Sequence, residues 1–230
     1  MKIFGLQKLS LLDFPGKTAC TVFTGGCNWR CPFCHNAALV TELNTVETLD
    51  EDEFFAFLKK RKDILEGVCI TGGEPLMQPD IVEFIKDIRA LGYPVKLDTN
   101  GSFPKKLKEV VNLGLVDYVA MDIKNSPESY EKTVGINNLD LTAVRESAAF
   151  LMSDAVDYEF RTTVVKEFHC TEDFESIAQW IQGAKRYYLQ SFTDSGDIIG
   201  DNLSAYTKDE LKRFKDILTP YIEYVELRGV

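Results

Sequence analysis

Three of the six cysteines in this sequence lie close together, at Cys27, Cys31 and Cys34. Three residues separate the first pair and two separate the second, so the three thiolates can converge on one metal centre. Soft thiolate ligands of this kind select zinc, copper(I) or iron–sulfur clusters. Plain buried thiols are the structural alternative, and the tight spacing favours a metal site over them.

The two main metal interpretations differ in what completes the coordination. Zinc needs a further ligand beside the three thiolates. His35 directly follows Cys34, which makes joint closure of a tetrahedron awkward, and Cys20 would have to reach back from a predicted strand. Three cysteines on a 4Fe–4S cluster leave one iron without a protein ligand, and such an open position can bind a substrate. The residues alone leave both interpretations open.

The composition is that of a folded protein. The chain has 230 residues, a net charge of −10 and 45% hydrophobic residues, which is enough apolar material for one packed domain over residues 1–230. The other three cysteines, Cys20, Cys69 and Cys170, stand among apolar neighbours. Because free cysteine behaves as a small apolar residue, we predict that these three lie in the core.

Charge and hydropathy argue against several classes of partner. The acidic net charge disfavours a duplex nucleic-acid partner, and the longest basic run, residues 59–62, is predicted to be a solvated helix face. No apolar run approaches the roughly 18 to 20 residues that a membrane span needs. The opening residues lack a signal-peptide pattern. We therefore expect a cytoplasmic protein that binds neither nucleic acid nor membrane.

Alternating strands and helices must position the cysteines. Strands are predicted at 18–24, 68–71, 95–99, 118–123, 160–165 and 187–192, with a final short strand at 225–228. Helices are predicted at 48–58, 79–91, 104–111, 141–152, 174–181 and 208–218. Capping boxes at 48–51 and 207–210, and Pro79 at a first helical position, are expected to mark three helix starts. Six strand–helix units predict a parallel α/β sheet, doubly wound or barrel-like, and fall short of a complete eightfold barrel.

Loops with polar residues follow four consecutive predicted strands. The first strand leads into residues 25–36, which contain the cysteines, and the next three lead into 71–75, 98–101 and 122–124. In parallel α/β folds such loops meet at one rim, where active sites are built. A further loop at 193–206, rich in Asp, Ser and Gly, is expected near the open edge of the sheet.

The residues of these loops resemble a known family. Cys-x3-Cys-x2-Cys, with an aromatic residue, Phe33, before the last cysteine, is similar to the signature of the radical S-adenosylmethionine (SAM) enzymes. Four segments resemble the branch of this family that installs glycyl radicals: Cys34-His35-Asn36, Gly72-Gly73-Glu74-Pro75, Asp98-Thr99-Asn100-Gly101 and Asp122-Ile123-Lys124. The opening segment, residues 5–17, is similar to that of activating proteins of anaerobic ribonucleoside-triphosphate reductases.

The resemblance implies a partial (β/α)6 barrel and two cofactors. Cys27, Cys31 and Cys34 would hold a 4Fe–4S cluster whose open iron binds the amino and carboxylate groups of SAM. The other implied SAM contacts are Phe33, His35, Gly72, Gly73, Glu74, Asp98, Asn100, Asp122 and Lys124, with Arg161 and Gln190 as weaker candidates. Hard oxygen ligands from Asp98, Thr99 and Asp122 form a candidate monovalent-cation site.

Some of these contacts have a specific role under the resemblance. Phe33 and His35 would place backbone groups near the adenine. Gly72 and Gly73 would let the backbone approach the methionine end closely, for which the lack of a Cβ is the physical requirement. Glu74 would aid recognition of the ammonium group, or would instead cap the following turn.

The implied activity is the reductive cleavage of SAM and the generation of a glycyl radical on a partner enzyme. A flavodoxin- or ferredoxin-type protein would supply the electron. Some activases of pyruvate formate-lyase have a histidine near the end of the sixth strand, where this chain has Gln190, so anaerobic ribonucleotide reductase is favoured as the partner. The alternatives are radical chemistry on a small molecule, as in deazapurine synthesis, and, from a different class, a zinc-stabilised binding module.

Overall fold

One eight-stranded sheet dominates the computed structural model, which describes residues 1–230. The strands lie side by side in sequence order: β1 (Ile3–Ser10), β2 (Ala19–Thr24), β3 (Gly67–Gly72), β4 (Val95–Thr99), β5 (Tyr118–Asp122), β6 (Asp157–Val164), β7 (Arg186–Ser191) and β8 (Tyr224–Arg228). Every neighbouring pair from β2 to β8 is parallel, whereas β1 runs antiparallel to β2. The predicted strands are confirmed, and β1 adds one that the sequence patterns did not predict.

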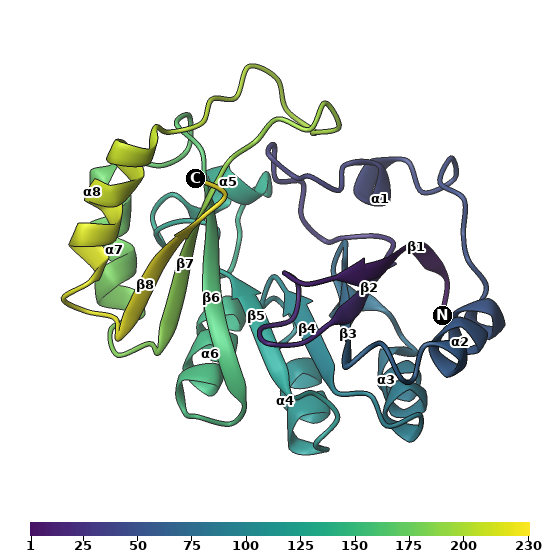
Figure 1. The fold of residues 1–230 in the computed structure, drawn as a ribbon. Helices are drawn as coiled ribbons and strands as arrows, with labels where there is room; N and C mark the ends of the chain where they lie inside the picture. The colour runs from purple at the N-terminus through teal and green to yellow at the C-terminus, as the bar shows by residue number, and fades with distance from the viewer.

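Helices connect the strands: the two shortest, at 38–41 and 130–134, lie at the carboxyl ends of the strands, and the others pack against the outer face of the sheet (Figure 1). Their bounds are α1 (Ala38–Thr41), α2 (Glu51–Lys60), α3 (Ile81–Ala90), α4 (Pro104–Asn112), α5 (Tyr130–Val134), α6 (Thr142–Met152), α7 (Thr171–Trp180) and α8 (Lys208–Leu218), with a short 3-10 turn η1 (Pro75–Met77). The sheet curves so that β1 and β8 face each other across a gap (Figure 1). These two strands do not pair, so the barrel stays open, as the predicted partial (β/α)6 barrel requires.

The core lies between the helices and the outer face of the sheet. Apolar side chains recur on one face of each helix, for example Phe54 and Leu58 on α2 and Phe84 and Ile88 on α3, and all four are buried. Burial of such faces drives the packing of helix on sheet. The inner face of the sheet is different, because it carries charged groups such as Lys96. The apolar core therefore stabilises the fold while the inner face is left for polar groups.

Three predicted helix starts are wrong by two or three residues, and one of them is that of α7, which begins at Thr171 and not at 174. Helix α2 begins at Glu51 after Asp50, and no side chain caps it, so the predicted capping box at Thr48 does not form. Pro79 lies in a turn, and α3 begins at Ile81. The second capping box is confirmed: the hydroxyl of Thr207 accepts from the backbone N–H of Glu210 at the start of α8.

The prediction of three core thiols holds for Cys20 and Cys69 and fails for Cys170. Cys170 is exposed because it precedes the first residue of α7, where its backbone N–H donates to the Asp173 carboxylate at 2.9 Å. None of the helices combines the length and the apolar character that a membrane-spanning segment requires.

Candidate functional site

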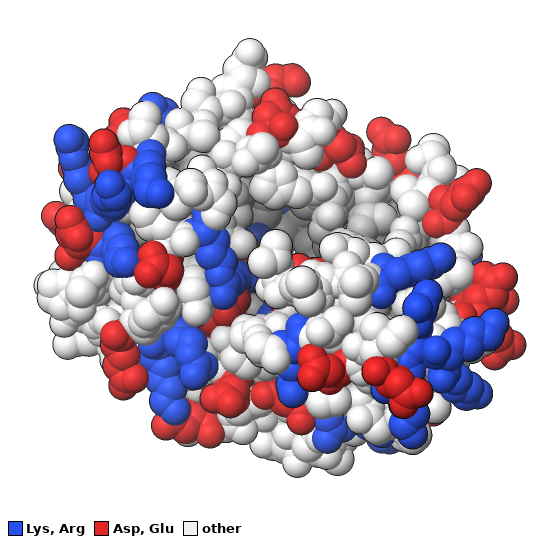
Figure 2. All heavy atoms as spheres, in the orientation of Figure 1, with Lys and Arg blue, Asp and Glu red and all other residues white.

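An open cavity with about 900 Å3 of space free of protein atoms lies at the carboxyl ends of the strands. It is seen as a hollow in the face of the molecule in Figure 2. The residues that line it are Cys27, Trp29, Cys31, Phe33, Cys34, His35, Asn36, Val40, Thr71, Gly72, Gly73, Asp98, Thr99, Asn100, Asp122, Lys124, Arg161, Thr163 and Gln190. The fold therefore gathers all the predicted site residues around one cavity, with the single exception of Glu74.

The three clustered cysteines are free thiols on the loop that follows β2. Cys31 is buried and the other two are half-buried. The Cys27 sulfur accepts a hydrogen bond from the backbone N–H of Trp29 at 3.4 Å and from the Asn100 amide at 3.8 Å. Burial raises the pKa of Cys27 and that of Cys31, the latter to about 12. Iron binding must therefore displace protons from these thiols.

The donor set fits an iron–sulfur cluster. Three soft thiols on one loop face one cavity, and no disulfide sequesters them. No three His, Cys, Asp or Glu side chains lie close enough together to coordinate a single metal ion. A four-iron cluster instead offers a separate iron to each thiolate. Lys124 also lines the cavity, and its charge lowers the pKa of Cys31 against the larger effect of burial.

Hydrogen bonds tie the cysteine loop to the loop after β3. The Asn36 amide donates to the carbonyl of Gly72 at 2.8 Å, and the backbone N–H of Gly73 donates to the carbonyl of Thr24 at 3.0 Å. A Cβ at Gly72 would lie 2.2 Å from the carbonyl oxygen of Thr24, and one at Gly73 would lie 2.0 Å from that of Gly26. Close packing against the end of β2 thus requires glycine at both positions, whatever binds in the cavity.

Glu74 caps a turn, the second of the two roles considered for it. Its carboxylate is buried and accepts from the Leu76 backbone N–H at 3.0 Å, the Thr99 hydroxyl at 2.8 Å and the Asn100 backbone N–H at 2.7 Å. Burial raises the pKa of Glu74 to about 7 against these three donors. Glu74 joins the loops that follow β3 and β4 and does not line the cavity.

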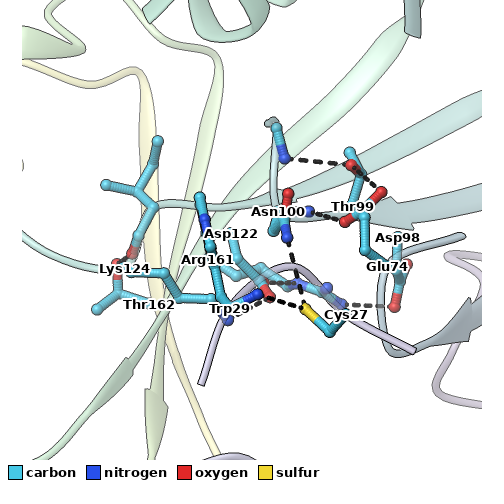
Figure 3. A network of polar contacts seen from close by, with 12 residues as sticks. Cys27, Trp29, Glu74, Asp98, Thr99, Asn100, Asp122, Lys124, Arg161 and Thr162 are labelled. Carbon is cyan, nitrogen blue, oxygen red and sulfur yellow. Dashed lines mark hydrogen bonds and ion pairs between the residues drawn. The ribbon is translucent and has the colours of Figure 1, made fainter. Parts of the chain in front are cut away.

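A series of alternating charges, Lys96–Asp98–Arg161–Asp122–Lys124, runs along the inner face of the sheet, and all of them except Lys96 line the cavity. Lys96 pairs with Asp98. Arg161 lies between the two carboxylates (Figure 3): its Nη1 is 3.1 Å from Asp98 and its Nε is 3.1 Å from Asp122. Lys124 ends the chain, 2.8 Å from Asp122. We call these five residues the upper chain. Burial pushes the pKa of Asp122 upward, but Lys124 and Arg161 outweigh it and lower the pKa to about 2.

The same contacts leave the candidate cation site without support. All four carboxylate oxygens of Asp98 and Asp122 pair with Lys96, Arg161 or Lys124. The Thr99 hydroxyl is engaged with Glu74 instead. These oxygens therefore already have cationic or hydrogen-bonding partners and do not converge on an ion.

Two further predicted residues that line the cavity, Phe33 and His35, pack against neighbouring loops. The His35 ring stacks on Phe192, and its Nε2 lies 2.9 Å from the carbonyl oxygen of Thr193. The buried Phe33 packs against Phe168. The predicted 193–206 loop contacts the cysteine loop, because the backbone N–H of Gly200 donates to the carbonyl of Pro32 at 2.7 Å.

Sequence reasoning missed one member of the upper chain, Lys96. Its signal is a lysine inside an otherwise apolar predicted strand, Val95-Lys96-Leu97, two residues before Asp98. Side chains two apart on a strand point to the same face. This spacing would have placed an ammonium group beside the carboxylate.

The geometry agrees with a match to known proteins. Residues 21–168, more than half of the chain, match the family model of the radical SAM superfamily. The chain belongs to this superfamily. It is a radical SAM enzyme, and membership implies a 4Fe–4S cluster and SAM as cofactors.

Two curated relatives show how far the likeness of this radical SAM enzyme extends. A Methanocaldococcus jannaschii protein named "putative glycyl-radical enzyme activating enzyme" is 31% identical over 238 aligned residues, which cover 99% of this chain and 96% of the relative. The 7-carboxy-7-deazaguanine synthase of Koribacter versatilis is 32% identical over 154 residues, which cover 66% of this chain and 63% of that protein. The first likeness spans both chains and the second only part of each.

Solved structures share the fold at low identity. Streptococcus suis SuiB superposes with a TM-score of 0.71 at 14% identity, covering 91% of this chain and 48% of SuiB, so the radical SAM chain spans about half of that protein. A domain of the pyruvate-formate lyase-activating enzyme from Bacteroides vulgatus has a TM-score of 0.58 at 16% identity, covering 71% of this chain and 99% of that domain. At these identities the two structures establish the fold alone.

Proposed function

We propose that this chain, as one domain over residues 1–230, activates a glycyl radical enzyme by cleaving SAM reductively. The observation that carries the proposal is the 31% identity over nearly the whole length of the Methanocaldococcus relative. When bound, the cluster would pass one electron from the proposed donor to SAM, and the cleavage into methionine and a 5'-deoxyadenosyl group would supply the radical able to take a hydrogen atom from the Cα of a glycine in the partner. Cys27, Cys31 and Cys34 are the proposed cluster ligands, because they are the thiols that face the cavity.

The upper chain is suited to hold the polar end of SAM. It contains three cations, Lys96, Arg161 and Lys124, against two carboxylates, Asp98 and Asp122. Lys124 and Arg161 line the cavity and have N–H groups beyond those used in the chain. An anionic carboxylate at this wall would balance the excess positive charge.

Other residues lining the cavity have proposed roles in orientation and the exclusion of water. Asn100 lines the cavity and is held by Glu74 through its backbone N–H. Phe33, His35, Gly72 and Gly73 are proposed to contact the rest of SAM, and Gln190 lines the cavity from β7, the strand next to β6. No general acid, base or nucleophile is needed on the protein, because the cofactors carry the difficult chemistry.

The gap between β1 and β8 is the proposed entrance for a partner's glycine segment (Figure 1). Anaerobic ribonucleotide reductase is the proposed partner, with pyruvate formate-lyase or another glycyl radical enzyme as the alternative. A flavodoxin- or ferredoxin-type protein is the proposed electron donor, and the cytoplasm the proposed compartment. The opening segment, residues 5–17, supports the reductase.

A second candidate is radical chemistry on a small molecule. The chain is 32% identical to the deazaguanine synthase over about two thirds of its length, and this likeness supports the second candidate. The shorter match ranks it below activation of a partner protein.

Anaerobic purification, cluster reconstitution and electron paramagnetic resonance distinguish these functions. We expect a brown protein with about four irons per chain, which cleaves SAM when reduced and gives a glycyl doublet when mixed with the reductase. Cleavage of SAM without a glycyl signal on any glycyl radical enzyme would direct attention to a small-molecule substrate. A colourless protein with about one zinc and no iron would contradict both radical functions and indicate the zinc-stabilised module.

A further inference from the structure

Lys96 is a charged residue of the site that does not reach the cavity. It lies on β4 with its side chain only 3% exposed, and it is absent from the residues that line the site. Burying an ammonium group costs free energy unless the group is paired, so the burial of Lys96 has to be explained by its partners.

The groups around the Lys96 ammonium are few and specific. The thiol of Cys69 on β3 lies 3.8 Å from it, and the Asp98 carboxylate pairs with it through Oδ1. The other oxygen of Asp98 accepts from Arg161 at 3.1 Å. Asp98 is therefore held by Lys96 on its own strand and by Arg161 on β6, and the Cys69 thiol makes a longer contact of 3.8 Å with its Oδ1.

The second contact of Arg161 carries this constraint to the cavity. Its Nε donates to Asp122, whose other oxygen binds Lys124. Asp98, Arg161, Asp122 and Lys124 all line the cavity, whereas Lys96 does not. Because each carboxylate oxygen has one cationic partner, the rotamer of Arg161 depends on a fixed Asp98, and Lys96 is what occupies the remaining oxygen of Asp98.

We propose that Lys96 is a positioning residue for SAM binding, acting through Asp98 on the orientation of Arg161. The proposal rests on the function proposed above, since it assumes that SAM binds against the upper chain. Without the ammonium group, the Oδ1 of Asp98 keeps only the 3.8 Å contact with the Cys69 thiol, so Asp98 is held less firmly and fixes the orientation of Arg161 toward the ligand less well. Lys96 itself touches neither SAM nor the cluster.

A double-mutant cycle tests this inference on the cluster-loaded, oxidised protein, which binds SAM without turning it over. The variants are Lys96→Met, Asp98→Asn and the two combined, and the measurement is the SAM dissociation constant by equilibrium dialysis. We expect Lys96→Met to weaken binding about tenfold, and the double variant to bind no more weakly than Asp98→Asn alone, because coupled residues are not additive. Lys96→Arg, which keeps the charge, is expected to stay within about threefold of the wild type.

Glu159→Gln is the matched control. Glu159 is also a buried charge on the inner face, 1% exposed and paired with Arg228, but it does not line the cavity. We expect this variant to bind SAM within about twofold of the wild type. Iron content and the unfolding temperature are measured for every variant, and Lys96→Gln replaces Lys96→Met where the Met variant does not fold.

Three results would overturn the positioning role: unchanged SAM affinity in Lys96→Met, additive losses in the cycle, or a loss in Lys96→Arg as large as in Lys96→Met. A wild-type protein that carries a cluster and binds no SAM would instead contradict the proposed function. The two failures are therefore distinguishable in one set of measurements.

Discussion

Two polar networks lie on the inner face of the sheet, and they differ in charge balance and in access. The upper chain, Lys96 to Lys124, has one more cation than carboxylate and opens to the cavity. Deeper in the barrel, Arg228 binds the 1% exposed Glu159 through two hydrogen bonds of 2.6 and 2.9 Å, and Tyr118 donates to the same carboxylate at 2.9 Å. We call Glu159, Arg228 and Tyr118 the lower group.

The lower group is balanced, with one carboxylate and one guanidinium, and neither charge lines the cavity of the site. Arg228 belongs to the last strand and stacks over the ring of Tyr188, with Cζ 3.3 Å from the ring centroid. Because its charges compensate each other, this group links β8 to β6 and needs no ligand to neutralise it. An unbalanced, open network next to three thiols is the one that suits an ionic ligand, so charge balance separates the structural network from the functional one.

The largest expected effect comes from Cys31→Ser, which removes one proposed cluster ligand beside the upper chain. We expect iron to fall from about four per chain to below one, with complete loss of SAM cleavage, because a cluster on two thiolates is not retained. The apo forms of variant and wild type should unfold at similar temperatures, since the lower group is untouched. Cys170→Ser, at an exposed cysteine outside the cavity, is the control and should keep its iron.

The next effect falls on the lower group. Arg228→Met leaves the Glu159 carboxylate buried without its cation, and we expect a loss of about 3 kcal/mol in unfolding free energy by chemical denaturation. SAM affinity of the folded protein should stay within about twofold. Pairing Arg228→Met with Glu159→Gln should recover part of the stability, because the uncompensated charge is then gone. An Arg228→Met protein of normal stability and weakened SAM binding would reverse the assignment of the two networks.

A smaller effect distinguishes the upper chain by its response to acid. The pKa of Asp122 is lowered to about 2 in the folded protein, below its ordinary 3.8, so this carboxylate stabilises the fold above pH 3.8. That contribution, about 2 kcal/mol, is lost as the pH falls from 3.8 through 2. The stability difference between wild type and Asp122→Asn should therefore shrink by this amount between pH 5 and pH 2. A constant difference over that range would contradict the depressed pKa.

The sequence predicted the rim of the site better than its interior. Cys27, Asp98 and Asp122 are recognisable because they follow apolar strand patterns, and the parallel topology brings the ends of those strands together. Lys96 stands inside a strand, and its spacing places it on the same face as Asp98 without saying that this face points into the barrel. Only the curvature of the sheet turns its face inward, and curvature has no local sequence signal.

Strand β1 and the misplaced start of α2 have local reasons. Only Ile3 and Ser10 of β1 are buried, so an edge strand of this kind shows no apolar alternation. At α2 the carboxylates Glu51, Asp52 and Glu53 occupy the first turn, where they stabilise the helix dipole without a capping hydroxyl. Gly72 and Gly73 show a related limit of sequence reasoning. They were predicted to let the backbone approach a ligand, but close packing against the backbone of Thr24 and Gly26 already requires glycine at both positions.

The smallest effect tests whether the lower group is as closed as its geometry indicates. Burial, and then Glu159, raises the pKa of Tyr118 well above its ordinary value, so its hydroxyl remains a donor at every working pH. Tyr118→Phe removes one of the three hydrogen bonds to Glu159 and leaves the two from Arg228, so we expect a loss of about 1.5 kcal/mol, less than for Arg228→Met. SAM affinity and the acid response should match the wild type. A change in either would mean that the two networks act on each other, and the division between them would then have to be redrawn.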